Sequence, residues 1–381
     1  MKTAAIVTCN DSYDYHTRTK YVCDFLVKTG YKVTFLISDF DHRNKVFYNA
    51  KRSDAIEYIH VRPYKKNISL TRILSHLDYA NGVKEKILNS EFDLVYHCAP
   101  PNSTIKALSE IKNTKKFELV TEIGDMWPET LPVSNIIKTI LVIPLTFWKN
   151  LRNKYLFNSN YIIAECDLFK NQLIKHTKLQ NIETMYFCKQ SDFVEINDRK
   201  FDQDKQIVFC YLGSINNIID IDIIGLIINK LVNDRKVIVH IIGDGEKKDK
   251  LLNAIENNGG QAIFHGKIFS EKEKKNIFSK CDYSLNIMKK SVNVGMTMKS
   301  LDYFSFGIPI INNIDGDICE IVENESIGFN VSKDNIDFVI NKIKTMDYNS
   351  YNCMVKHVQN THDKYFSIER FNQKMKKILD I

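Results

Sequence analysis

The strongest candidate for phosphate chemistry is the stretch Asn286–Asn313, in which a helix is predicted to start near Thr297. The free N–H groups and the positive dipole at a helix N-terminus favour a bound phosphate. Lys299 and Asp302 are three residues apart and therefore share one face of this helix. We predict that Lys299 binds a diphosphate and that Asp302 accepts hydrogen bonds from sugar or ribose hydroxyls. The alternative for this pair is an ordinary surface ion pair.

Glycines and further polar residues follow other predicted strands of the same half. A glycine lets the backbone approach a ligand, and a lysine attracts an anion. The alternatives are plain tight turns and solvated side chains. The run Gly243-Asp244-Gly245 lacks the further glycine of a dinucleotide fingerprint, so it does not predict a dinucleotide site. The phosphate-site candidates besides Lys299 are Gly213, Ser214, Gly243, Gly245, Lys267, Lys289 and Ser300.

A second polar stretch, Glu122–Glu129, follows a predicted strand in the first half of the chain. It holds three carboxylates, a tryptophan and a proline. Asp125 and Trp127 suit a polyhydroxylated ligand, because the carboxylate bonds hydroxyls and the ring stacks on sugar faces. The alternative is a core tryptophan with solvated acids. Pro101 and His16 follow other strands of this half and are further candidates for the same ligand.

The elements that carry these residues are short apolar runs alternating with amphipathic stretches, which predicts parallel sheets with both faces covered by helices. The predicted strands are Ala4–Cys9, Lys32–Ser38, Ile56–Val61, Leu94–His97, Glu118–Thr121, Tyr161–Glu165, Gln206–Leu212, Val237–Ile242, Ala262–His265, Tyr283–Ile287, Pro309–Asn312 and Gly328–Val331. The predicted helices include Arg18–Thr29, Ile221–Val232, Glu271–Lys280 and Ser367–Ile381. A charged segment, Ser191–Lys205, separates the two series, so we expect domains at residues 1–190 and 206–366.

Composition excludes several other classes of protein. With 381 residues, 44% hydrophobic and 26% charged, the chain is globular and long enough for two domains. Its N-terminus is interpreted as a first strand and not as a signal peptide. Nine cysteines without a Cys-x-x-Cys pair predict neither a disulfide framework nor a zinc site, which favours a reducing cytoplasm. The net charge of +7 is not arranged as a basic stripe with interleaved aromatics, so no nucleic acid is expected.

Asp-x-Asp pairs do not change the expectation that no metal binds. None of them combines a strand end with a nearby histidine.

The segment Lys138–Leu156 places apolar and aromatic residues beside Lys149, Arg152 and Lys154. It is too short to span a bilayer, and Pro144 interrupts it. Two interpretations stay open. The segment lies at an anionic membrane interface, or it is a buried helix with snorkelling basic side chains.

With these motifs in place, the sequence resembles bacterial GT-B glycosyltransferases of the retaining, family-4-like group that builds capsular, exopolysaccharide and lipopolysaccharide chains. The resemblance covers nearly the full length. It rests on the blocks Asp125-Met126-Trp127-Pro128-Glu129, Pro100-Pro101, Gly213, Gly243-Asp244-Gly245-Glu246, Met298-Lys299, Asp302-Tyr303 and Gly307-Ile308-Pro309.

The resemblance implies two doubly wound Rossmann-like domains that face an interdomain cleft. Residues 206–366 would hold a nucleotide-sugar donor, with UDP favoured over GDP, and residues 1–190 a lipid-linked glycan acceptor. The helix at 367–381 would cross back onto the first domain. Asp125 near the acceptor and Lys299 near the donor diphosphate would be the catalytic residues. The implied reaction needs no cofactor besides the donor and no metal, and it would take place in the cytoplasm at the inner face of the membrane.

The sequence departs from the family pattern at three positions. Val294 stands where the first of two paired glutamates is usual, and Gly124 replaces a basic residue before Asp125. No Arg or Lys follows Gly213 within residues 214–220. The alternatives to a transferase are a GT-B nucleotide-sugar epimerase and a non-catalytic GT-B-like partner in polysaccharide assembly.

Overall fold

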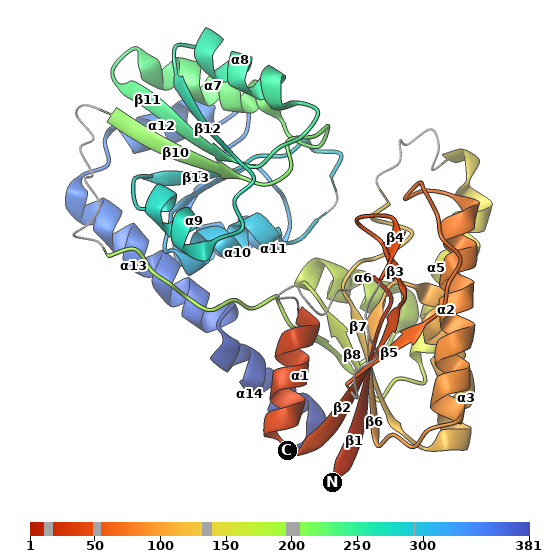
Figure 1. Ribbon diagram of the computed structural model, residues 1–381. Coiled ribbons are helices and arrows are strands. Elements are labelled where there is room, and N and C mark those ends of the chain that lie inside the picture. Colours follow the sequence, from red (N-terminus) through yellow and green to blue (C-terminus); the bar gives the residue numbers. More distant parts are fainter. Residues whose placement is uncertain (11–17, 49–54, 132–138, 196–205, 293) are drawn as a thin grey trace. The chain divides into compact units, whose positions relative to one another are not determined.

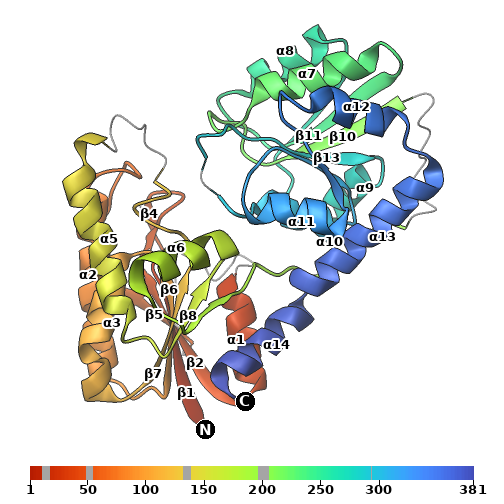
Figure 2. The ribbon, with the colours of Figure 1, turned by 180° about the vertical axis from the view of Figure 1, so that it is seen from behind.

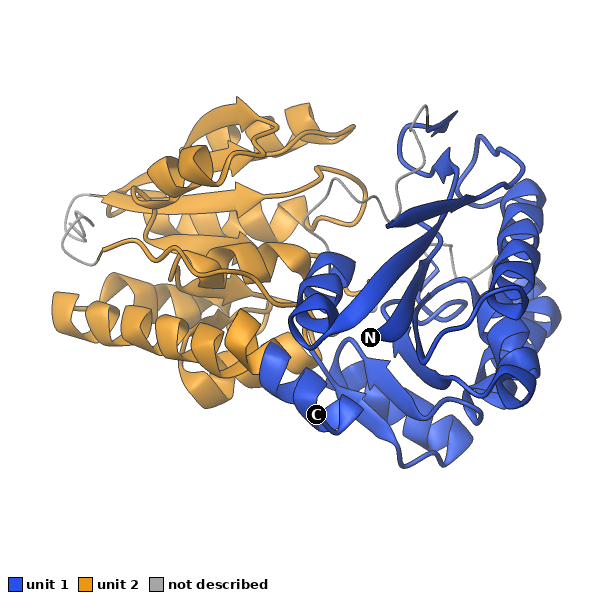
Figure 3. Cartoon of the chain, turned by 60° about the horizontal axis from the view of Figure 1, so that its bottom comes forward, with its two compact units in different colours: residues 1–185, 372–381 blue, residues 186–371 orange. Residues whose placement is uncertain are grey.

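The computed structural model describes residues 1–10, 18–48, 55–131, 139–195, 206–292 and 294–381 (Figure 1). The chain divides into two compact units (Figure 3). Unit 1 consists of Met1–Met185 with Asn372–Ile381, and unit 2 consists of Tyr186–Phe371. His16 lies outside the described residues, as does the part of the predicted linker at 196–205.

Unit 1 is built on a seven-stranded sheet in the order β5-β2-β1-β6-β7-β8-β9, in which every pairing is parallel. Its strands are β1 (Lys2–Thr8), β2 (Tyr31–Ser38), β5 (Ile56–Ile59), β6 (Leu94–Ala99), β7 (Glu118–Ile123), β8 (Tyr161–Ala164) and β9 (Ile182–Thr184), beside a small hairpin of β3 (Phe40–Asp41) and β4 (Val46–Phe47). Its helices are α1 (Arg18–Lys28), α2 (Leu70–Leu88), α3 (Asn102–Lys115), α5 (Val142–Leu156), α6 (Asp167–Thr177) and the end of α14 (Ile368–Leu379). Helices α2, α3 and α5 lie on one side of the sheet and α1 on the other (Figures 1 and 2).

Unit 2 repeats this plan with a six-stranded parallel sheet in the order β12-β11-β10-β13-β14-β15. Its strands are β10 (Gln206–Leu212), β11 (Lys236–Ile242), β12 (Gln261–Gly266), β13 (Tyr283–Asn286), β14 (Ile310–Asn312) and β15 (Gly328–Asn330). Its helices are α7 (Ile221–Val232), α8 (Lys248–Asn257), α9 (Glu271–Phe278), α10 (Met298–Ser305), α11 (Asp317–Glu325), α12 (Ile336–Lys344) and α13 (Tyr348–Tyr365). The strand order reverses between β10 and β13.

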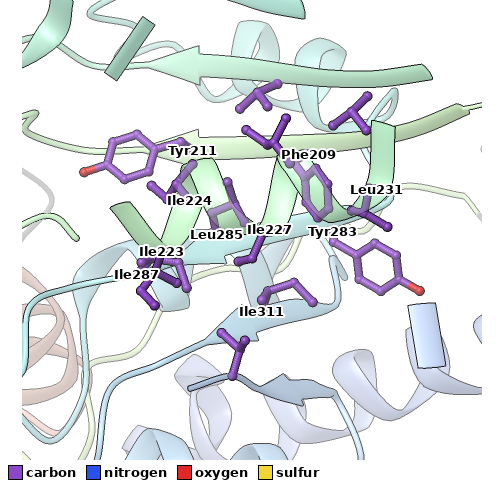
Figure 4. Close-up of a cluster of buried hydrophobic side chains, with 14 of the residues drawn as sticks. Phe209, Tyr211, Ile223, Ile224, Ile227, Leu231, Tyr283, Leu285, Ile287 and Ile311 are labelled. Carbon is purple, nitrogen blue, oxygen red and sulfur yellow. The ribbon is translucent and has the colours of Figure 1, made fainter. Parts of the chain in front are cut away.

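The predicted fold class is confirmed, because both units are parallel α/β structures with the Rossmann-like plan. The bounds of β10 and α7 coincide with those predicted, and no other predicted strand differs by more than two residues at either end. The α7 prediction succeeded because its apolar residues recur at helical spacing. Ile223, Ile224, Ile227 and Leu231 are all buried in the core of unit 2 (Figure 4). A single apolar face of this kind is buried by packing on a sheet.

Three asparagines form a ladder across the carboxyl ends of three neighbouring strands. Asn286, Asn312 and Asn330 are paired in register along β13, β14 and β15. The Asn286 amide donates to the Asn312 side-chain oxygen (2.9 Å), and the Asn312 amide donates to that of Asn330 (2.8 Å). Thr297, the N-cap of α10, donates its hydroxyl to Asn286 (3.0 Å). The ladder therefore fixes the N-terminus of α10 against the sheet.

Two glycines are required where the turns after β10 and β11 touch. Gly243 has φ +144°, and a Cβ there would lie 1.9 Å from the Gly213 carbonyl oxygen. Gly245 has φ +156°, and its Cβ would lie 2.4 Å from the Ile215 oxygen. Gly213 itself has φ +125° with nothing within 4 Å of a built Cβ. Backbone packing thus explains Gly243 and Gly245, whereas open space adjoins Gly213.

We expect the Gly243→Ala variant to unfold at a thermal midpoint well below that of the Gly266→Ala variant. Both positions have positive φ, +144° and +70°, so both substitutions carry backbone strain of about 1–3 kcal/mol. Only Gly243→Ala also collides with backbone, because nothing lies within 4 Å of a Cβ at Gly266. Calorimetric melting of the two variants measures the difference. Equal midpoints would show that the contact between the two turns is not structurally required.

Candidate functional site

The candidate donor site lies at the carboxyl ends of β10 and β13, where the strand order of unit 2 reverses. In open parallel sheets this switch point is where ligands bind. Gly213 directly follows β10, and α10 is the first helix after β13. Of the first N–H groups of α10, those of Ser300 and Leu301 donate to the cap residue Thr297, whereas those of Met298 and Lys299 have no acceptor among the described residues. The fold therefore places the open turn and the helix N-terminus of the prediction at the same edge.

Lys299 is a buried cation without a counter-ion. It is the second residue of α10 and is only 8% exposed. Its Nζ lies 4.8 Å from the centroid of the Tyr211 ring, and among the described residues it has no hydrogen-bond or ion-pair partner. Burial lowers the pKa of Lys299 to about 8. The alternative of a surface ion pair between Lys299 and Asp302 is excluded, because Asp302 pairs with Lys189 and Lys274 and the Lys299 ammonium lies over the Tyr211 ring of β10.

Two tyrosines hold the β10 turn and α10 together. The Tyr303 hydroxyl of α10 accepts from the Leu212 N–H (2.8 Å) and donates to the Leu285 carbonyl of β13 (3.2 Å). The Tyr211 hydroxyl donates to the Ser214 carbonyl (3.0 Å), while its ring lies under the Lys299 ammonium. Because both tyrosines are buried, Lys299 is held beside the Gly213 turn.

Asp302 belongs to a network of ion pairs with two lysines, and this network was not predicted from the sequence. Its Oδ1 accepts from Lys189 and from Lys274, the latter at 3.1 Å. Glu271 lies 2.8 Å from Lys189 and 2.6 Å from Lys274, so it balances the second positive charge. Neither lysine contacts Oδ2 of Asp302, which remains able to accept a hydroxyl. The network therefore fixes the orientation of the Asp302 carboxylate and leaves Oδ2 available as an acceptor.

The other predicted phosphate ligands divide into open and occupied groups. Ser214 is exposed beside Gly213, and Lys267 and Lys289 are exposed as well. By contrast, Ser300 is fully buried, and its hydroxyl lies 2.6 Å from that of the cap residue Thr297. Its predicted contact with a ligand is therefore wrong for the side chain.

The two glycines of the β11 turn are occupied in the same way. The Gly243 N–H donates to the Gly266 carbonyl (2.7 Å), and the Gly245 N–H donates to Asp244 (2.8 Å). A phosphate would find neither N–H free, so the predicted donor contacts at Gly243 and Gly245 are wrong.

In unit 1, Asp125 lies in the loop that follows β7. Burial raises the pKa of this carboxyl, opposed by hydrogen bonds from the Thr130 hydroxyl, the Trp127 side chain and the Met126 N–H. A buried carboxylate with a raised pKa is a typical acid–base group. Asp125 is therefore the carboxylate of this loop that is suited to chemistry.

The other two carboxylates of this stretch are structural. Glu122 pairs with Arg18 (3.1 Å) and accepts from the Tyr96 hydroxyl (2.5 Å), and its side chain is buried. The Glu129 carboxylate accepts two hydrogen bonds from the fully buried Arg152, one from each terminal nitrogen and each 2.9 Å long.

Trp127 is not an open stacking platform, which corrects the prediction of a sugar-binding ring. It is 9% exposed, with the Arg72 guanidinium 4.5 Å from its ring centroid and the His76 ring stacked at 5.9 Å. A sugar cannot reach a ring whose surroundings are already filled. Pro101 is buried at the start of α3, so it shapes the site without offering a polar contact.

Arg72 was missed by the sequence prediction. It is the third residue of α2 and only 7% exposed, and its guanidinium lies close enough to Asp125 and Cys9 to affect their pKa values. One sequence signal existed, since a predicted strand, Ile56–Val61, ends shortly before it. Nothing in the sequence indicated that an arginine eleven residues further on lies back at the edge of the sheet.

Helix α5 exposes its apolar residues and buries a basic one. Ile143 is 80% exposed and Phe147 is 72% exposed, whereas Arg152 is fully buried. The interpretation of a buried helix with snorkelling basic side chains is therefore wrong. Of the helices in the described ranges, none has the length and apolarity needed to cross a bilayer.

No metal-binding group is found among the described residues, taken as three or more His, Cys, Asp or Glu side chains around one point. All nine cysteines are free thiols.

The comparisons with known proteins concern the domain and the fold. Residues 206–346 match the family described as Glycosyl transferases group 1, a match that lies wholly within unit 2. Among curated protein sequences, none matches the chain.

Solved structures cover the whole length. Sucrose-phosphate synthase from Thermosynechococcus elongatus has a TM-score of 0.73 and 12% identity, over 100% of this chain and 98% of that chain. HepE of Anabaena, in complex with UDP and glucose, has a TM-score of 0.64 and 14% identity over 100% of both chains. WaaG, described as a glycosyltransferase involved in lipopolysaccharide biosynthesis, has a TM-score of 0.62 and 11% identity, over 98% of this chain and 99% of that chain. The chain thus has the GT-B fold, and residues 206–346 of unit 2 are similar to the group 1 glycosyl transferases.

We expect Lys299→Met to raise the thermal midpoint of the unliganded protein by several degrees at pH 7. The folded pKa of about 8 is below the usual 10.5, so the charged form costs about 3 kcal/mol in the folded state. This cost is fully present below pH 8 and disappears as the pH rises towards 10.5, because the unfolded chain then holds the extra proton. The stability gap between variant and wild type should therefore narrow over that range. A stability difference that widens as the pH rises would contradict the assignment of Lys299 as a buried cation with a lowered pKa.

Proposed function

We propose that this protein transfers a sugar from a UDP-sugar to a hydroxyl of a lipid-linked glycan. Unit 2 binds the donor and unit 1 binds the acceptor. The single observation that carries this proposal is Lys299, a buried ammonium at the N-terminus of α10 and beside the open turn at Gly213, for which the described part of the chain supplies no anion. A diphosphate there supplies the missing negative charge and accepts from the first N–H groups of the helix.

Departure of the diphosphate is the step that this site assists. The bond between the sugar C1 and the diphosphate oxygen breaks, and negative charge builds up on that oxygen. Lys299 and the N–H groups of α10 stabilise that charge without a metal ion. The C1 carbon then bonds to the acceptor oxygen with its configuration retained, and the hydroxyl proton passes to the leaving diphosphate.

On the acceptor side, Asp125 orients the hydroxyl through a hydrogen bond. The choice of UDP is supported by HepE, whose structure contains UDP. The free Oδ2 of Asp302 is available for a ribose hydroxyl, since both lysines contact Oδ1.

A nucleotide-sugar epimerase is the second enzyme to consider, and the acceptor distinguishes it. An epimerase converts the donor sugar without membrane lipid, whereas a transferase needs the lipid-linked acceptor. A non-catalytic partner would bind no nucleotide-sugar at millimolar concentration.

The acceptor proposal is supported by an apolar surface on unit 1. It is formed by the exposed side chains of Ile68, Leu70, Ile73, Leu74, Leu77, Ile140, Leu141, Val142, Ile143 and Phe147. We name this set the apolar surface. The exposed Lys65 and Lys66 lie three and two residues before Ile68. Apolar side chains flanked by lysines suit an anionic membrane, where the proposed acceptor is anchored.

We expect calorimetry in chelator to show UDP binding that Lys299→Met weakens about 10- to 100-fold, the loss of a charge-assisted bond. Lys236→Met is the matched control, because this exposed lysine begins β11 at the opposite edge of the same sheet. The wild-type affinity should fall above about pH 8 as Lys299 loses its proton, while that of Lys299→Met stays level. If UDP binds equally well to both lysine variants, the donor site is misplaced.

We expect the double variant Ile143→Ser/Phe147→Ser to lose most binding to vesicles of mixed anionic and neutral phospholipids. These two side chains are 80% and 72% exposed, so their removal costs little stability and removes apolar area that the membrane would bury. Val27→Ser, also exposed at 56% but on α1, serves as the control. Co-sedimentation measures the bound fraction. Undiminished binding by the double variant would exclude the apolar surface as the membrane contact.

A further inference from the structure

Lys274 is a buried cation of unit 2 that the sequence motifs did not indicate. It lies in α9 and is 7% exposed, and its ammonium lies 3.1 Å from Oδ1 of Asp302 and 2.6 Å from Glu271. Asp302 belongs to a different helix, α10. A buried ion pair is costly to break, because the partner that remains keeps an uncompensated charge. Lys274 therefore fixes the Asp302 carboxylate relative to α9.

Lys189 approaches the same carboxylate oxygen from a distant part of the chain. Its ammonium contacts Oδ1 of Asp302 and lies 2.8 Å from Glu271. Its backbone is anchored as well, since its N–H donates to the Phe366 carbonyl (2.9 Å) and its carbonyl accepts from Nε2 of His362 (3.1 Å). Backbone hydrogen bonds therefore hold this second lysine beside Asp302.

The two lysines leave one oxygen of Asp302 for a ligand. An ionised carboxylate oxygen has about two acceptor sites, and the two ammoniums fill both sites of Oδ1. Within the described ranges, no hydrogen bond or ion pair reaches Oδ2. The Asp302 side chain is 22% exposed, so a ligand has access to it. Two free oxygens would match both hydroxyls of a ribose diol, whereas Oδ2 alone matches one hydroxyl.

The network carries no net charge that would attract a diphosphate. Lys189 and Lys274 supply two positive charges, and Asp302 and Glu271 supply two negative ones. Each ammonium contacts both carboxylates, so neither lysine replaces Lys299 as the cation for the donor diphosphate. The contribution of the network is therefore geometric, since it determines which oxygen of Asp302 is open to a ligand.

We propose that Lys274 and Lys189 are positioning residues that restrict Asp302 to a single hydroxyl of the donor ribose. The two lysines hold Oδ1, and Oδ2 accepts from one of the two ribose hydroxyls. A hydrogen bond to an ionised carboxylate is about twice as strong as a neutral one, so the loss of that one hydroxyl is costly. The other hydroxyl contributes little. This inference rests on the proposed function, since it takes a uridine nucleotide as the donor.

The probes are UDP, 2′-deoxy-UDP and 3′-deoxy-UDP, each titrated into the protein by calorimetry in chelator. Both analogues keep the base and the diphosphate, and each lacks one ribose hydroxyl. We expect the wild type to bind one analogue about 10- to 100-fold more weakly than UDP, as for one lost bond to a charged group. The other analogue should bind within about threefold of UDP. The unequal loss is the signature of a carboxylate with one open oxygen.

Lys274→Met should bring the affinities for UDP and the disfavoured analogue to within about threefold of each other, because Oδ1 loses a partner and the carboxylate turns more freely. Lys274→Arg keeps a charged donor for Asp302 and Glu271, so it should restore part of the difference. Lys272→Met is the matched control. It removes the same charge from an exposed position on α9 and should leave the difference as in the wild type.

The ratio of two affinities is measured on one and the same variant, so a general loss of stability does not change it. Three results would overturn the inference. Both analogues bind the wild type as tightly as UDP, in which case Asp302 contacts no ribose hydroxyl. Both analogues bind equally weakly, in which case the carboxylate accepts from the whole diol. In the third, Lys274→Met keeps the wild-type ratio, which would make Lys274 a purely structural residue.

The wild-type titration with UDP separates this inference from the proposed function. UDP that binds with the wrong pattern among the analogues overturns the role of the two lysines and leaves the proposed function standing. UDP that does not bind the wild type overturns both.

Discussion

The structure depends on one costly feature, a cation buried at the carboxyl edge of a parallel sheet with no anion beside it among the described residues. Lys299 in unit 2 and Arg72 in unit 1 are both more than nine-tenths buried. Removing such charges from water is unfavourable unless a counter-charge arrives. Binding of the proposed diphosphate donor at Lys299 would relieve part of this unfavourable unliganded state. The rest of the fold holds these cations in place without neutralising them.

The need to hold a buried cation without neutralising it explains which polar groups surround each site. In unit 2, the ladder of Asn286, Asn312 and Asn330 and the hydroxyl of Tyr303 hold α10 to the sheet with neutral groups only. In unit 1, the carboxylates of the Asp125 loop are engaged by other partners, such as Arg152 for Glu129. Neutral hydrogen bonds give rigidity without supplying the charge that the ligand must provide. The apolar surface of α2 and α5 adds a second exposed feature that a lipid-linked substrate would cover.

The fold was largely predictable because its signal is local. The apolar residues of a strand or helix recur at a fixed spacing that is visible within a few residues. The strand Gln206–Leu212 and the helix Ile221–Val232 were predicted in this way, and the structure has the same bounds. The place of Lys299 at the start of a helix was also predictable, since a strand end and the cap residue Thr297 precede it in one short stretch. Trp127 was misjudged, because an aromatic ring beside a carboxylate looks the same in sequence whether its faces are open or covered. Only Arg72 and His76, about fifty residues earlier in the chain, decide that question.

The sequence by itself therefore determined the parallel α/β architecture, the order of the elements and the loops at which chemistry should occur. Tertiary structure alone decided which charges in those loops are already paired. Asp302 is bonded by Lys189, 113 residues away, and Glu122 of strand β7 pairs with Arg18 of helix α1. Lys299, by contrast, finds no anion among the described residues. The physical reason is that periodicity acts between neighbours along the chain. Charge pairing and desolvation depend instead on distances in space, which arise only once the sheet has brought remote segments together.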